Sequence, residues 1–180
     1  REPFTIFIFG GSLGALGINT LVLESLGHLG ELKNRVRFIH QTGEADYMRV
    51  LEGNRKAGTQ ARVEKFIHEM AAAYAESSLL ICRAGSSTLA EIAAVGRASI
   101  LVPLPTASDN HQETNARVFS DVGAAFLLSQ LKSGGGDLAA MIRTAVEDPS
   151  KVDRMEQAVV AFHRPHAAQD IVKALRSTSV

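Results

Sequence analysis

The stretch FTIFIFGGSLG, at residues 4–14, decides the fold class of this chain of 180 residues. Its first six residues are β-branched or aromatic, which is typical of a short buried β-strand. Two glycines end that run, and after Ser12 the apolar residues recur with the period of a helix to about residue 30. The stretch therefore predicts a strand, a glycine turn and a helix in that order.

The same strand and helix unit repeats along the chain. Further strands are predicted over residues 36–40, 61–66, 79–82, 99–102 and 124–128, and further helices over residues 44–52, 70–75, 88–95, 111–122 and, in two or three pieces, 137–176. Parallel neighbouring strands need a helix that returns the chain from one to the next. The alternation therefore predicts an α/β fold with a Rossmann-like, doubly wound parallel sheet, formed by residues 1–180 as one domain.

Composition and charge argue against several classes of function. The chain has 46% hydrophobic and 21% charged residues, and its 19 Lys and Arg balance its 19 Asp and Glu. That balance argues against nucleic acid as a partner. Residues at the N-terminus lack the pattern of a signal peptide, and no apolar run approaches the roughly 20 residues of a membrane span, so we expect a cytoplasmic protein. The chain starts at Arg1 instead of Met, which suggests a piece of a longer protein.

The glycine turn at residues 10–14 follows the first strand, where a helix N-terminus offers N–H groups to a phosphate. Gly11 and Gly14 would let the backbone approach a diphosphate closely. The Ser12 hydroxyl would either donate to a phosphate oxygen or only cap the helix, and this segment leaves both open. A nicotinamide fingerprint is not met, because it needs glycine at Phe9 and an acidic residue where residues 40–42 read HQT.

A second helix start of the same kind follows the fourth predicted strand, at residues 83–91, RAGSSTLAE. If the first and fourth strands are neighbours, both helix N-termini face one crevice and could hold a diphosphate from two sides. Glu91 would accept hydrogen bonds from two ribose hydroxyls, or would form a capping box with Thr88. Arg83 would reach a phosphate, or would form a structural ion pair.

A polar loop at residues 103–116 leads from the fifth strand into a helix. Its amides suit sugar hydroxyls, although Asp109 and Asn110 are also ordinary helix caps and Gln112 could be a solvated surface amide. The sequence has no Asp-x-Asp pair and no His or Cys spacing typical of a metal site, so we expect neither a metal nor another cofactor. The single Cys82 closes an apolar run and is expected to be a small buried apolar residue.

Five segments in order resemble one family: GGSLGA at 10–15, HQTG at 40–43, FIHEMAAAY at 66–74, RAGSSTLAE at 83–91 and DNHQETNA at 109–116. They resemble the C-terminal, nucleotide-sugar-binding half of the peptidoglycan N-acetylglucosaminyltransferases of the MurG family. The resemblance implies the C-terminal half of a GT-B glycosyltransferase fold, with the N-terminal acceptor domain absent from this chain. Members of the family transfer N-acetylglucosamine from UDP-N-acetylglucosamine (UDP-GlcNAc) to lipid I, which gives lipid II with inversion at the anomeric carbon.

The resemblance also implies a role for each matching position. Ser12 and residues 86–88 would hold the diphosphate, the backbone of Ile67 would read the uracil edge, Glu91 would hold the ribose, and His111 with Gln112 would contact N-acetylglucosamine. With the family considered, the ribose role of Glu91 takes precedence over the capping box. The full set of predicted substrate-binding residues is Gly11, Ser12, Gly14, Ile67, Arg83, Ser86, Ser87, Thr88, Leu89, Glu91, His111 and Gln112.

The catalytic residues are expected outside this chain, because the family places its general base and its lipid I contacts in the N-terminal domain. We therefore expect this chain to bind UDP and donor without turning over. The full-length enzyme would lie on the cytoplasmic face of the bacterial inner membrane and would serve cell wall synthesis, cell shape and division. Two alternatives remain: the catalytic subunit of a two-chain transferase acting on another lipid diphosphate, and a UDP-GlcNAc 2-epimerase-like domain.

Overall fold

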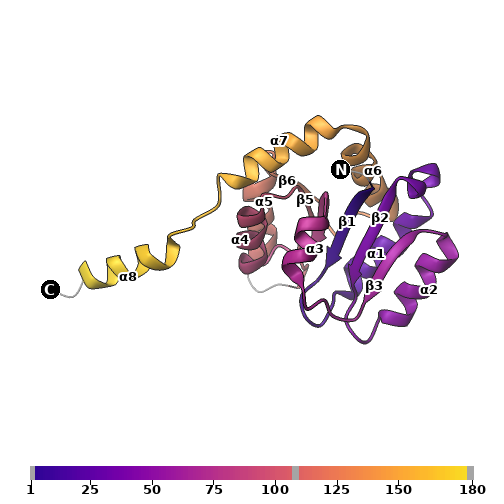
Figure 1. Ribbon diagram of the computed structural model, residues 1–180, viewed down its shortest axis with the longest axis horizontal. Helices are drawn as coiled ribbons and strands as arrows, with labels where there is room; N and C mark the ends of the chain where they lie inside the picture. The colour runs from indigo at the N-terminus through magenta and orange to yellow at the C-terminus, as the bar shows by residue number, and fades with distance from the viewer. Residues whose placement is uncertain (1–2, 107–109, 178–180) are drawn as a thin grey trace.

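The computed structural model describes residues 3–106 and 110–177 and contains one six-stranded sheet (Figure 1). All five pairings are parallel, and the strand order is β3-β2-β1-β4-β5-β6. The strands are β1 (Phe4–Phe9), β2 (Val36–Gln41), β3 (Gln60–Glu64), β4 (Leu79–Cys82), β5 (Ser99–Leu101) and β6 (Ala125–Leu127). The predicted α/β fold is confirmed, and β1 lies beside β4 as the shared crevice requires.

Helices connect the strands and continue beyond the last one. They are α1 (Leu16–Leu26), α2 (Tyr47–Ala57), α3 (Met70–Glu76), α4 (Ser86–Val95), α5 (His111–Ser120), α6 (Gly135–Glu147), α7 (Pro149–Val160) and α8 (Ala167–Ser177), with a short 3-10 helix, η1, at Gly30–Asn34. The first helix was expected directly after Ser12, which is wrong, because it begins at Leu16. Gly11 and Gly14 have φ angles of 93° and 77°, so a right-handed helix cannot begin before the turn is complete.

Strands β1, β4 and β5 are buried on both faces, which explains their nearly continuous apolar sequence, whereas the edge strand β3 is partly exposed and mostly polar. Ile6 and Ile8 of β1 pack with α1 and α6, whereas Phe7 and Phe9 point to the opposite face and pack with α3, α4 and α5. Cys82 in β4 is fully buried, and this burial raises the pKa of its thiol well above the usual range. The expectation of a small buried apolar residue is confirmed.

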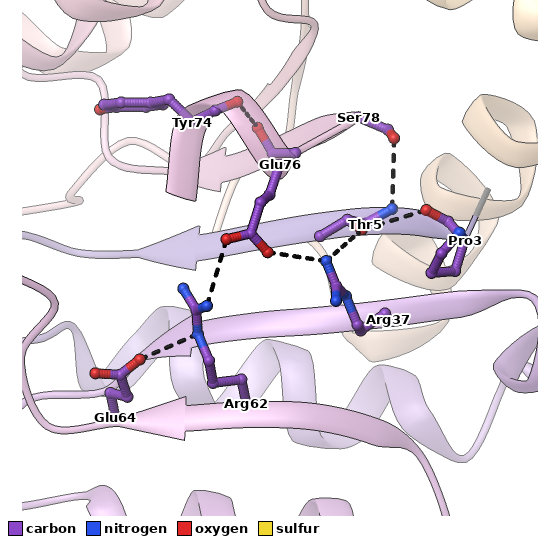
Figure 2. Close-up of polar contacts among 9 residues, drawn as sticks. Pro3, Thr5, Arg37, Arg62, Glu64, Tyr74, Glu76 and Ser78 are labelled. Carbon is purple, nitrogen blue, oxygen red and sulfur yellow. Dashed lines mark hydrogen bonds and ion pairs between the residues drawn. The ribbon is translucent and has the colours of Figure 1, made fainter. Parts of the chain in front are cut away.

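An ion-pair network covers the sheet beside the edge strand β3 (Figure 2). Glu76, at the end of α3, lies between Arg37 of β2 at 3.0 Å and Arg62 of β3 at 3.5 Å, and Arg62 also pairs with Glu64 at 3.1 Å. These side chains are roughly two-fifths exposed. Each pair therefore stabilises the fold by less than about 1 kcal/mol, and the network mainly keeps this part of the sheet polar.

The last helix, α8, stands away from the rest of the molecule (Figure 1). None of its residues is buried, and its apolar side chains Ile171 and Leu175 are 61% and 65% exposed. In the part of the chain that the structure describes, no helix combines the length and the apolar composition needed to cross a membrane.

Candidate functional site

Two adjoining cavities open around the carboxyl ends of β1 and β4, where the strand order reverses. Open parallel sheets bind ligands at this position. The first, named here the Tyr74 cavity, measures about 520 Å³, and the second, the Gln112 cavity, measures about 650 Å³. Each is large enough for a nucleoside or a sugar, since ligand pockets commonly span roughly 300 to 1,000 Å³.

The two cavities share part of their lining and differ in the polar groups that they carry. Residues common to both are Phe9, Gly11 and Thr88. Polar residues of the Tyr74 cavity are Ser12, Gln41, Tyr74, Ser87 and Glu91, and those of the Gln112 cavity are Arg83, Thr106, Gln112 and Gln130. The cavities therefore meet between the glycine turn and the first turn of α4, which brings together most of the residues predicted from the sequence.

The glycine turn presents Ser12 at the rim of the Tyr74 cavity. Ser12 is exposed, and the N-cap of α1 is Ala15, three residues further on. A capping role for the Ser12 hydroxyl is therefore wrong, because the turn has not yet entered the helix at that point. Ser12 lines the Tyr74 cavity beside Gly11, and its predicted phosphate contact remains a prediction.

The start of α4 forms the opposite wall. Gly85 is the N-cap and residues 86–88 form the first turn, where backbone N–H groups have no partner within the helix. Ser87 and Thr88 line the Tyr74 cavity. Leu89, which was also predicted to bind substrate, is 6% exposed and its side chain packs in the core below the site.

Glu91 is held by a buried tyrosine. The Tyr74 hydroxyl donates a hydrogen bond of 2.7 Å to Glu91 Oε2, and Tyr74 is 5% exposed. Burial and the neighbouring carboxylate raise the pKa of Tyr74 above its usual range, so the hydroxyl stays protonated as a donor. The capping box of Thr88 and Glu91 is wrong, because α4 begins at Ser86 and places Glu91 in its second turn.

Arg83 supports the wall of the Gln112 cavity. Its Nη1 donates to the carbonyl oxygens of Val102 and Pro103 at 3.0 and 3.2 Å, which fixes the chain as it leaves β5. Among residues 3–106 and 110–177, Arg83 has no carboxylate partner, so the predicted structural ion pair is not found there and backbone carbonyls take its place. A phosphate contact from Arg83 remains a prediction.

Gln112 also connects two backbone segments. Its Oε1 accepts hydrogen bonds from the backbone N–H groups of Leu104 and Ala84, at 3.0 and 3.3 Å. The interpretation as a solvated surface amide is therefore wrong, and a contact with a sugar hydroxyl would use the Nε2 donors. The neighbouring His111 is exposed and lies outside the lining of both cavities.

Two residues in the loop before α5 were expected to cap that helix, and the structure describes one of them. Asn110 is the N-cap of α5, as expected, with a φ of 54°, although its side chain makes no capping hydrogen bond. Asp109 lies outside the described residues.

Gln41 is a site residue for which sequence reasoning assigned no role. It is 4% exposed, its Nε2 donates to the carbonyl oxygen of Gly11 at 2.9 Å, and its Oε1 accepts from the N–H of Ile67 at 2.8 Å. Since that N–H is already bonded, a contact of Ile67 with a base would use its carbonyl oxygen. The feature of the sequence that could have indicated this role is the position of Gln41 at the carboxyl end of β2, beside the glycine turn.

Within residues 3–106 and 110–177, no three His, Cys, Asp or Glu side chains group to hold a metal ion.

Comparison with known proteins agrees with the architecture. Residues 5–173 match the model of the glycosyltransferase family 28 C-terminal domain. The chain is 43% identical over 171 residues to the UDP-N-acetylglucosamine--N-acetylmuramyl-(pentapeptide) pyrophosphoryl-undecaprenol N-acetylglucosamine transferase of Myxococcus xanthus. This match covers 95% of this chain and 45% of that protein. It is 45% identical over 173 residues to the protein of the same name in Thermodesulfovibrio yellowstonii, with 96% and 47% covered.

A solved structure supports the same relationship. The crystal structure of MurG from Acinetobacter baumannii matches with a TM-score of 0.86 and 31% identity, over 98% of this chain and 52% of that one. The fold is thus one half of a GT-B glycosyltransferase. The chain belongs to glycosyltransferase family 28 and matches the C-terminal domain of that family. It spans about half the length of the curated relatives that it matches.

Proposed function

We propose that this chain is the donor-binding domain of an inverting transferase that moves N-acetylglucosamine from UDP-GlcNAc to lipid I in peptidoglycan synthesis. The observation that carries the proposal is the pair of cavities that meet at Gly11 and Thr88. One cavity carries a fixed carboxylate and the other an oriented amide, as a ligand with a ribose at one end and a sugar at the other requires. Two relatives above 40% identity bear the name of such a transferase.

In this proposal the Tyr74 cavity takes the uridine and the Gln112 cavity takes the N-acetylglucosamine. Glu91 accepts hydrogen bonds from the ribose hydroxyls, and the carbonyl of Ile67 contacts the uracil. The diphosphate lies between Ser12 and the first turn of α4. The N–H groups of that turn and the Thr88 hydroxyl then stabilise the negative charge that develops on the departing UDP.

The other half of the enzyme would supply the acceptor site. An inverting transfer needs a general base to take the proton from the acceptor hydroxyl. We assign the base and the lipid I contacts to the N-terminal domain, so this chain alone binds donor without turnover. The whole enzyme would then act at the cytoplasmic face of the inner membrane, and its product would support cell shape and division.

The proposal predicts UDP binding that depends on Glu91. In calorimetric titrations, we expect this chain to bind UDP, and Glu91→Ala to weaken the affinity by about 10- to 100-fold, because hydrogen bonds to a charged acceptor contribute about 1.5 to 3 kcal/mol. Glu147→Ala, at an exposed position near the end of α6, is the matched control and should leave the affinity unchanged. NAD that binds this chain as tightly as UDP would contradict the proposal.

Tyr74→Phe should show whether the carboxylate needs its support. The substitution removes only the hydroxyl that donates to Glu91. We expect UDP affinity to fall by about 3- to 10-fold, since a typical hydrogen bond contributes about 0.5 to 1.5 kcal/mol. In the Glu91→Ala background the same substitution should have little further effect, because the two residues act as a pair. Additive losses in the double variant would show that Tyr74 acts independently of Glu91.

A further inference from the structure

The side chain of Gln41 joins two segments that lie far apart in the sequence. Gly11 belongs to the turn after β1, and Ile67 belongs to the segment between β3 and α3. One buried amide bonds to both, with its nitrogen on the Gly11 carbonyl and its oxygen on the Ile67 N–H, at 2.9 and 2.8 Å. Gln41 also lines the Tyr74 cavity, so this connection forms part of the ligand-facing wall.

The chemistry of the two partners fixes the orientation of the Gln41 amide. A carbonyl oxygen can only accept a hydrogen bond and a backbone N–H can only donate one. A flipped amide would place acceptor against acceptor at Gly11 and donor against donor at Ile67. The side chain can therefore satisfy both partners in only one way, and each bond holds the other in place.

The residues that follow Gln41 tie the same segments together. The N–H groups of Thr42 and Gly43 donate to the carbonyl oxygens of Glu64 and Lys65, at 2.9 and 3.0 Å, which fixes the chain as it leaves β3. The Gly43 backbone packs directly against the backbone of the glycine turn, with no room for a Cβ on Gly43. The end of β2 is thus a rigid support between the two segments.

We propose that Gln41 is a positioning residue that fixes the separation between the diphosphate-binding turn and the base-contacting segment. This inference rests on the proposed function. It states that a nucleoside diphosphate gains affinity because its two halves meet surfaces already held at the correct spacing. UDP bridges both segments, whereas uridine contacts only one of them. Removal of the link should therefore weaken the affinity for UDP much more than the affinity for uridine.

Two substitutions of Gln41 and one control separate positioning from a general structural role. Gln41→Met keeps the length of the side chain and removes both hydrogen bonds, whereas Gln41→Glu keeps an acceptor for the Ile67 N–H and removes the donor to Gly11. Gln60→Met, at an exposed position at the opposite end of the sheet, is the control. Affinities for UDP and for uridine are measured by titration, and the folding of each variant by its denaturation midpoint.

We expect Gln41→Met to weaken the affinity for UDP by about tenfold or more, because two coupled hydrogen bonds are lost. The affinity for uridine should fall by less than about threefold. In Gln41→Glu, the affinity for uridine should stay within about threefold of that of the unsubstituted chain. The affinity for UDP should fall at least as much as in Gln41→Met. Equal losses for both ligands, or no loss for UDP, would overturn the inference. If Gln41→Met does not fold, the same comparison of the two ligands in Gln41→Leu, which is also uncharged and lacks both hydrogen bonds, decides in the same way. Failure of the unsubstituted chain to bind UDP would instead refute the proposed function.

Discussion

Replacement of Gly14 by alanine should destabilise the chain by about 3 kcal/mol or more and abolish its binding of UDP. Gly14 has a φ of 77°, which side-chain-bearing residues rarely adopt, and a Cβ there would collide with the carbonyl group of Thr42. Strained backbone conformations cost about 1 to 3 kcal/mol each, and the collision with backbone adds to that cost. To relieve the backbone strain and the collision with Thr42, the glycine turn would have to move away from the end of β2.

Chemical denaturation measures this effect, with Gly27→Ala as the control. Gly27 is the C-cap of α1, has a φ of −66°, and a Cβ there would make only an ordinary contact at 3.8 Å. We expect the control to stay within about 1 kcal/mol of the unsubstituted chain. A similar stability for Gly14→Ala and Gly27→Ala would show that the turn adapts without cost, contrary to the packing described here.

The second large effect is a loss of stability in mild acid that originates at His40. This residue is fully buried, and burial lowers its pKa from 6.5 to about 3, although the nearby Asp46 acts in the opposite direction. Between those two pKa values the unfolded chain binds a proton that the folded chain does not. The free energy of unfolding should therefore fall by about 1.4 kcal/mol per pH unit below pH 6.5, or by about 2 kcal/mol at pH 5.

Hydrogen bonds explain why His40 resists protonation. Asn19 uses its Nδ2 to donate to Thr42 O at 3.0 Å and to Asp46 Oδ2 at 2.8 Å. Asn19 Oδ1 is therefore the acceptor that faces His40 Nε2 at 2.9 Å, and Nε2 carries the proton of the neutral ring. No described residue reaches Nδ1 with a hydrogen bond, so a second proton would be buried without a partner.

His40→Gln tests this account, because its amide can still donate to Asn19 and does not titrate. Between pH 7 and pH 5, the free energy of unfolding of the unsubstituted chain should fall by about 2 kcal/mol more than that of this variant. The pKa of Asp46 is held below 3.8 chiefly by the hydrogen bond from Arg49, so that carboxylate does not titrate in this window. His163→Gln, at an exposed site, is the control, and parallel pH profiles for all three proteins would disprove the assignment.

The architecture could be predicted because its determinants are local. Apolar runs such as that of β1, each closed by a turn residue, specify strands buried on both faces, and the intervening helices then require parallel pairing. The position of the site follows from the same pattern, since both glycine-rich helix starts come after strands that end at one edge of the sheet. Gly11 and Thr88 were therefore expected to face one crevice, on the condition that the first and fourth strands are neighbours.

The hydrogen bonds that complete the site could not be predicted in this way. Tyr74 and Glu91 are separated by 17 positions, and Gln41 bonds to residues 30 positions before it and 26 positions after it. Local patterns left open a capping box for Glu91 and a solvated position for Gln112, because those patterns depend only on near neighbours in the sequence. Partner choice depended on tertiary distances, which residue spacing within one segment does not encode.

The ion pairs on β3 have a consequence for how this domain behaves at high concentration. An edge strand exposes unpaired backbone groups, which invite the strand of another molecule to extend the sheet. On β3 the charged side chains of Arg62 and Glu64 occupy the face shared with Arg37 and Glu76. A second strand placed alongside would have to bury or disrupt these charges, so the network protects this edge against intermolecular sheet extension and aggregation.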